Sequence, residues 1–223
     1  LGDVYKRQIL GLNQKAESYL AQGKLYEADT TCNEALVKLE DIALIYNTKG
    51  KVVEAMGNRK LAEEYYQKAI VINPNFSQAY FNLANLYFQQ KQWDLATVNY
   101  QKAIKLNPNF HWYYQKLGTA LMQLKKWNEA VNVYHLAIDI NPNISNYYND
   151  LGQALTKLKR WNEASIAYQK AIDINPDNYS YYCNLWEVLF KAKKWHETTV
   201  TYKQTLERNP SAYWYYYCLL YTS

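Results

Sequence analysis

Amide side chains recur at helical spacing in this sequence, and they offer hydrogen-bonding chemistry. Asn82 and Asn85 lie three residues apart, and Asn149 and Gln153 lie four apart, so each pair falls on one face of a helix. Each amide carries two donors and an acceptor. A row of amides can therefore pair with the main chain of an extended peptide whatever its side chains are.

Catalytic chemistry has no comparable pattern here. The three histidines, His111, His135 and His196, share no spacing, and no nucleophile, base and orienting group recur together. The sequence contains no glycine-rich phosphate loop, HExxH motif or paired CxxC motif. We therefore expect no enzymatic activity, no cofactor and no metal site.

The elements that would position the amides follow a fixed period. Four tryptophans stand 34 residues apart: Trp93, Trp127, Trp161 and Trp195. All five prolines keep the same interval: Pro74, Pro108, Pro142, Pro176 and Pro210. A constant period of this length indicates a repeat array, in which each unit packs only on its neighbours. The 24 tyrosines and 7 tryptophans fit this interpretation, because large side chains are needed to fill helix interfaces.

Within one period the spacing is aromatic-x2-Leu-Gly-x2-apolar, then Ala-x3-aromatic, then Pro. The residues on this spacing are Tyr114, Leu117, Gly118, Leu121, Ala130, Tyr134, Ala137 and Pro142. The pattern resembles the tetratricopeptide repeat (TPR), a helix-turn-helix unit that holds other proteins. The resemblance implies an all-α solenoid, a right-handed superhelix of antiparallel helix pairs.

The prolines set the frame of six repeats and the start of a seventh at residues 213–217. The repeats are 9–42, 43–76, 77–110, 111–144, 145–178 and 179–212. Residues 1–8 and 218–223 are similar to translated sequencing-adaptor read-through, so we interpret them as a non-native leader and tail. An array normally ends in a polar cap. The lack of one predicts a fragment that self-associates through its uncapped C-terminal end.

Side-chain size and capping residues predict how the helices pack and where they begin and end. Gly118, Ala130 and Ala137 are small enough to let two helices approach closely. Asn128 and Asn162 precede acidic residues and are expected to be N-caps. Second helices are expected to end at the proline-containing sequence that closes the repeat, as at Asn141, Pro142 and Asn143, because proline disfavours helix at the residue before it.

The resemblance also implies which face binds a ligand, because in TPR arrays a stripe of the first helix lines a concave groove. The predicted groove residues are Phe81, Asn82, Asn85, Trp112, Gln115, Lys116, Asn149, Asp150, Gln153 and Asn184. We expect their amides to face solvent and to bind a peptide main chain. Lys116 lacks the basic neighbours with which some TPR proteins hold a C-terminal carboxylate. A simpler interpretation is that the face is polar without binding anything.

Charge and composition limit the partners. The formal net charge of +5 is modest, and the lysines cluster at the helix-helix turns, where they favour the helix dipole. A basic strip for an acidic partner remains an alternative, but nucleic acid is not the expected ligand. The three cysteines show no metal or redox spacing, and no apolar run reaches the length of a membrane span. We expect a cytoplasmic protein that does not contact a membrane.

Three functional hypotheses follow from these patterns. The first is a non-catalytic scaffold that binds a protein or peptide ligand in the groove. The second is the substrate-docking arm of a larger glycosyl-, methyl- or sulfotransferase. The row of asparagines is similar to the TPR region of O-linked N-acetylglucosamine transferases. Sequences similar to LKKWNEA and INPN also occur in bacterial proteins in which a TPR array precedes a transferase domain. The third, an RNA-binding array, is weaker because the groove is nearly neutral and phosphate contacts need basic residues.

Overall fold

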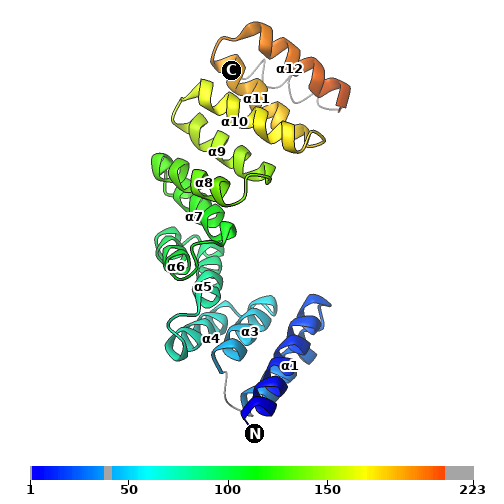
Figure 1. Ribbon diagram of the computed structural model, residues 1–223, viewed down its shortest axis with the longest axis vertical. Helices are drawn as coiled ribbons and strands as arrows, with labels where there is room; N and C mark the ends of the chain where they lie inside the picture. The colour runs from blue at the N-terminus through cyan, green and yellow to red at the C-terminus, as the bar shows by residue number, and fades with distance from the viewer. Residues whose placement is uncertain (1, 38–41, 209–223) are drawn as a thin grey trace. The chain divides into compact units, whose positions relative to one another are not determined.

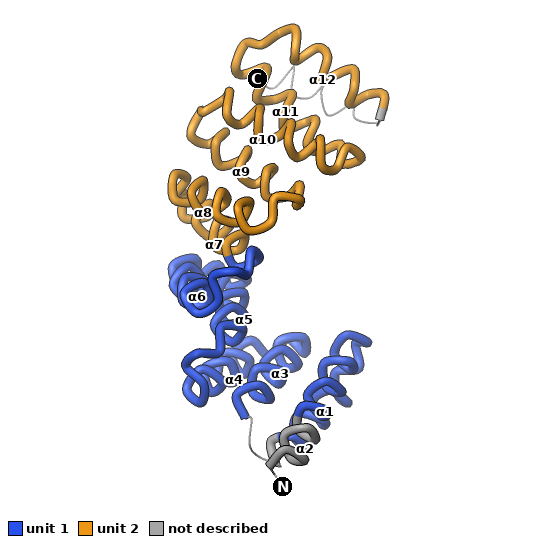
Figure 2. The backbone as a smooth tube through the Cα atoms, viewed as in Figure 1, with its two compact units in different colours: residues 1–113 blue, residues 114–223 orange. Residues whose placement is uncertain are grey.

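The computed structural model describes residues 2–37 and 42–208, and the ordered elements among them are all α-helices (Figure 1). The chain divides into two compact units, residues 1–113 and residues 114–223 (Figure 2). The predicted seventh repeat at 213–217 and the tail at 218–223 lie outside the described residues. The expectation of an all-α solenoid is confirmed.

Unit 1 contains three helix pairs and the start of the next helix. We call the odd-numbered helices first helices and the even-numbered ones second helices. The helices are α1 (Gly2–Ala21), α2 (Leu25–Val37), α3 (Ile42–Ala55), α4 (Arg59–Ile72), α5 (Ser77–Gln89), α6 (Trp93–Leu106) and α7 (His111–Gln123). Helix α1 includes most of the segment predicted to be a non-native leader, whose origin stays a prediction. Helix α7 crosses the boundary between the units.

Unit 2 continues from α7 with the same alternation. Its further helices are α8 (Trp127–Ile140), α9 (Ser145–Lys157), α10 (Trp161–Ile174), α11 (Tyr179–Lys191) and α12 (Trp195–Arg208). Among the described residues, no helix is both long and apolar enough to cross a membrane.

A tyrosine of the second helix lies against a glycine of the first helix in several pairs. A Cβ atom added to Gly118 would lie 2.4 Å from Cε1 of Tyr134, and one added to Gly152 would lie 2.7 Å from Cε1 of Tyr168. Both tyrosines are 2% exposed. The predicted close approach at Gly118 is therefore confirmed, and Ala130 and Ala137 are both fully buried.

The turns between paired helices share one hydrogen-bond pattern. In the α7–α8 turn, Lys126 N donates to Leu121 O at 2.9 Å, and Lys125 N donates to Met122 O at 3.1 Å. These are the two bonds of a Schellman turn, which requires a left-handed residue. Gly23 and Gly57 take the left-handed position in the first two turns, with positive φ. In the later turns a lysine takes it: Lys91, Lys125, Lys159 and Lys193, with φ between 58° and 61°.

The helix ends match the sequence signals, whereas two predicted N-caps are wrong. Helix α8 stops at Ile140, and the Asn141 side chain accepts from Asn143 N at 3.3 Å beside the proline. The N-cap of α8 is Lys126 rather than Asn128, and that of α10 is Arg160 rather than Asn162. The reason is the Schellman turn, because its last residue is also the residue from which the next helix begins.

Candidate functional site

Polar side chains join consecutive first helices within each unit at one repeated spacing. In unit 1, Asn82 Nδ2 donates to Asn47 Oδ1 at 2.8 Å between α5 and α3. In unit 2, Asn184 Nδ2 donates to Asn149 Oδ1 at 2.8 Å between α11 and α9. Both bonds join residues 35 apart. A side chain on one first helix therefore meets the residue one place beyond its equivalent in the next repeat.

Two further contacts follow the same spacing. Thr48 Oγ1 donates to Asn13 Oδ1 at 2.6 Å, and Gln115 Nε2 donates to Asp150 Oδ2 at 3.0 Å. We call the set the amide ladder: Asn13–Thr48 and Asn47–Asn82 in unit 1, and Gln115–Asp150 and Asn149–Asn184 in unit 2. We call the helix face that carries it, in each unit, the first-helix face.

The ladder changes how much of each amide is exposed. Asn82 is only 8% exposed, and its Oδ1 accepts from Gln78 Nε2 at 3.1 Å while its Nδ2 serves the ladder. The expectation that this amide faces solvent is therefore wrong, because the neighbouring repeat covers it. Asn149 and Asn184 are half-buried and retain part of their surface.

The ten predicted groove residues fall into one set on each unit. In unit 1, Asn85 Oδ1 accepts from the Tyr100 hydroxyl at 2.7 Å, and the Phe81 ring packs 4.7 Å from the ring of Tyr113. Trp112, also in unit 1, is 47% exposed. In unit 2, Gln115, Asn149, Asp150 and Asn184 come together in the ladder, whereas Lys116 and Gln153 are exposed beside it.

Sequence reasoning missed the contribution of the second helices to this face. Tyr66 donates its hydroxyl to Glu54 Oε2 at 2.6 Å, and Tyr168 lies 3.4 Å from Thr156 Oγ1. Each tyrosine ring is buried against the glycine opposite it, while its hydroxyl reaches a polar side chain of the first helix. The available signal was the tyrosine itself, because a buried phenol needs a hydrogen-bond partner.

Asp150 is the one carboxylate of the amide ladder. It is half-buried, and its other oxygen accepts from Asn149 Nδ2 at 3.5 Å. Burial raises the pKa of Asp150 above its usual value, while the two amide hydrogen bonds and the charge of Lys116 act in the opposite direction. Burial and, secondly, the Asp150 charge raise the pKa of Tyr147 to about 12.

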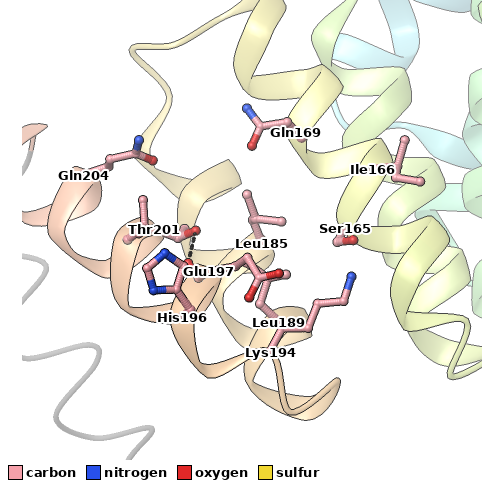
Figure 3. Close-up of a pocket in the computed structure, with 11 residues that line it drawn as sticks. Ser165, Ile166, Gln169, Leu185, Leu189, Lys194, His196, Glu197, Thr201 and Gln204 are labelled. Carbon is pink, nitrogen blue, oxygen red and sulfur yellow. Dashed lines mark hydrogen bonds between the residues drawn. The ribbon is translucent and has the colours of Figure 1, made fainter.

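Unit 2 also has grooves lined by its second helices. One of about 380 Å³ lies between α10, α11 and α12, where Leu185 and Leu189 provide apolar lining beside Ile166 (Figure 3). Another of about 380 Å³ lies one repeat earlier between α8, α9 and α10, lined by the equivalent Leu151 and Leu155. Within residues 2–37 and 42–208, no group of three His, Cys, Asp or Glu side chains is placed to hold a metal ion.

Comparison with family models identifies the repeats. Models described as "Tetratricopeptide repeat" match residues 43–76, 77–110, 99–132 and 145–178, and one described as "TPR repeat" matches residues 118–159. Together these matches run without a gap from residue 43 to residue 178.

A human protein and several solved structures are similar to this chain. "Tetratricopeptide repeat protein 6" of Homo sapiens is 33% identical over 95 residues, which are 43% of this chain and 18% of that protein. The chain thus matches only a small part of that relative's length.

Three of the solved structures illustrate the likeness in fold. That of pilF from Pseudomonas aeruginosa has a TM-score of 0.78 at 18% identity and covers 92% of this chain and 94% of its own. A structure of MamA has a TM-score of 0.69 at 22% identity, covering 73% and 95%. The structure of YrrB, described as "a TPR protein with an unusual peptide-binding site", has a TM-score of 0.71 at 17% identity, covering 80% and 92%. At these identities the likeness concerns the fold alone.

Proposed function

Because the chain belongs to the tetratricopeptide repeat family, we propose that it is a non-catalytic scaffold whose first-helix face binds an extended segment of a partner protein. Arrays of stacked repeats present rows of equivalent positions that suit an extended ligand. The observation that carries the proposal is the amide ladder of unit 2, where Asn149 and Asn184 are bonded to each other and still partly exposed.

The ladder bond between Asn149 and Asn184 leaves both amides with hydrogen-bonding capacity for a ligand. A primary amide has two N–H donors and a carbonyl that accepts two bonds. The Asn184–Asn149 bond uses one donor and one lone pair, so each side chain keeps further capacity. Because the bond also holds both side chains in one orientation, less conformational entropy is lost when a peptide main chain binds.

The peptide-binding site named for YrrB, which has a similar fold, supports this proposal. The alternative, that the array is the docking arm of a larger transferase, uses the same face. The surface tests below therefore apply to it without change.

The first test uses random peptides displayed on phage and selected on the full chain. Asn184→Ala and Gln153→Ala remove groups from the first-helix face of unit 2, whereas the control Gln169→Ala removes an exposed amide from α10. We expect each of the first two variants to weaken a selected peptide by about 0.5 to 1.5 kcal/mol, the usual net value of a hydrogen bond. Asn82 is unsuitable for this test, since its burial would mix stability with binding.

The control decides where the ligand lies. If Gln169→Ala weakened the peptides while the other two variants bound normally, binding would lie at the second-helix grooves, and the proposal would be wrong. Isothermal titration with each purified variant measures the difference.

A second test asks whether the basic turn residues, rather than the first-helix face, bind the peptide. Replacing the turn residues Lys125, Lys126, Lys159 and Arg160 with serine removes basic charge that lies away from the amide ladder. We expect peptide affinity to be unchanged. A loss of peptide affinity, together with a flatter salt dependence of binding, would show that the peptide binds at these basic turn residues.

A further inference from the structure

The ladder position of Asp150 does not require a carboxylate. The equivalent residues in two other repeats, Asn82 and Asn184, are asparagines, and each makes its 35-residue hydrogen bond. In its ladder bond Asp150 acts as the acceptor, from Gln115 Nε2, and an asparagine Oδ1 could accept the same bond. The negative charge is therefore an addition to the ladder rather than a part of its geometry.

That charge is held by neutral groups. Asp150 accepts from Gln115 and Asn149, both amides, and within the described part of the chain no basic side chain forms an ion pair with it. Other carboxylates of the protein have such a partner, as in the Glu187–Lys191 and Glu163–Arg160 pairs. The exposed Lys116 acts on Asp150 only through its charge, without forming an ion pair. A half-buried carboxylate that lacks a direct ion pair costs stability, which marks a position where a residue serves something other than the fold.

Asp150 lies on the first-helix face beside polar side chains that keep part of their surface. The ring of Tyr147 is fully buried, so it belongs to the packed layer beneath the face. Gln153, one turn further along α9, is exposed, and Asn149 and Asn184 are half-buried. The carboxylate thus lies among polar groups that a ligand on the first-helix face would contact.

From this charge complementarity we propose that the first-helix face of unit 2 selects a partner segment with a cationic side chain, a lysine or an arginine, which binds Asp150. The inference rests on the proposed function and adds its specificity. The ammonium or guanidinium group forms the direct ion pair that no described residue makes with Asp150, and a charge-assisted hydrogen bond is roughly twice as strong as a neutral one. The neighbouring amides then hold the main chain of the same segment.

The test uses the peptides selected from the phage library. We expect a lysine or arginine at one fixed place in the selected sequences, and its replacement by norleucine should weaken binding about tenfold or more. Asp150→Asn should weaken the parent peptide by a similar factor while leaving the norleucine peptide unaffected. Such coupling in a double-mutant cycle shows direct contact. Asp139→Asn, which removes an exposed carboxylate from α8, is the control and should change nothing.

The outcomes separate this inference from the proposed function. Peptides that depend on Asn184 but carry no basic residue, or that bind Asp150→Asn as tightly as the parent, would overturn the inference and leave the proposed function standing. If no peptide is selected, or if only second-helix variants affect binding, both are wrong. Should Asp150→Asn fail to fold, the norleucine peptide on the unmodified chain still decides, because equal affinity would exclude a bound cation.

Discussion

At the scale of single residues, the contact between a glycine and a tyrosine sets how closely a helix pair packs. Tyr134 lies over Gly118 so closely that even a methyl group there would overlap its ring. Sequence reasoning predicted the small residue and the large one, because both recur with the period. It did not predict that the tyrosine hydroxyl would continue to the first-helix face, since periodicity places a side chain on a helix but does not say how far it reaches.

Gly118→Ala tests this contact. The new Cβ would lie 2.4 Å from the buried ring of Tyr134, so we expect a loss of about 1 to 3 kcal/mol in the free energy of unfolding through overpacking. Gly11→Ala in α1 is the matched control, because its Cβ would meet no atom within 4 Å. A gain of about 0.5 to 1 kcal/mol is expected there from helix propensity. Equal effects of both substitutions in urea denaturation would contradict the packing argument.

The raised pKa of Asp150 predicts how its effect on stability varies with pH. A carboxyl group whose folded-state pKa lies above the unfolded value binds its proton more tightly when folded. The stability that this group contributes is therefore lost as pH rises from the unfolded-state pKa to the folded-state pKa. Asp150→Asn should equal the parent in acid and become the more stable chain at neutral pH. Thermal melts across the acidic range measure this, and an advantage for the parent at neutral pH would show that the charge supports the fold.

At the scale of elements, the turns explain which boundaries could be predicted. Helices α4, α6 and α8 end just before Asn-Pro-Asn as expected, because proline disfavours helix at the residue before it. The N-cap predictions at Asn128 and Asn162 failed because the Schellman turn makes the previous residue the cap. The glycines at 23 and 57 already marked the left-handed place. For the lysines at this position the sequence indicates only a favourable charge near the helix end. It does not indicate the left-handed conformation, since lysine has no preference for positive φ.

Lys159→Gly should relieve strain at one of these turns. Lys159 has a φ of 59°, a conformation that costs an L-residue about 1 to 2 kcal/mol. Part of this gain is cancelled by the greater freedom of glycine in the unfolded chain, so we expect about 0.5 to 1 kcal/mol of added stability. Lys157→Gly, two residues earlier at the last residue of α9, has no strain to relieve and should instead destabilise by up to about 1 kcal/mol. Chemical denaturation of both variants checks the contrast, and a destabilised Lys159→Gly would refute it.

At the scale of the whole molecule, the period predicted the fold but not the ladder. A 34-residue repeat shows that equivalent residues recur on equivalent helices, whereas the hydrogen bonds join residues 35 apart. The extra residue comes from the stagger between successive first helices, which depends on how repeats stack. For the same reason the burial of Asn82 could not be predicted from its own repeat, because the neighbouring repeat contributes its partner Asn47.

Stacking of this kind predicts that damage to one repeat stays local. Tyr168 is 2% exposed against Gly152 in unit 2, and Tyr168→Ala should cost about 3 to 5 kcal/mol by leaving a cavity. Because each repeat is stabilised by itself and its nearest neighbours, hydrogen exchange should accelerate in α9 and α10 while α3 and α4 keep their protection. Tyr66→Ala, at the equivalent contact in unit 1, should produce the reverse. A uniform loss of protection along the chain in either variant would mean that the two units unfold as one cooperative body and that nearest-neighbour stacking does not govern their stability.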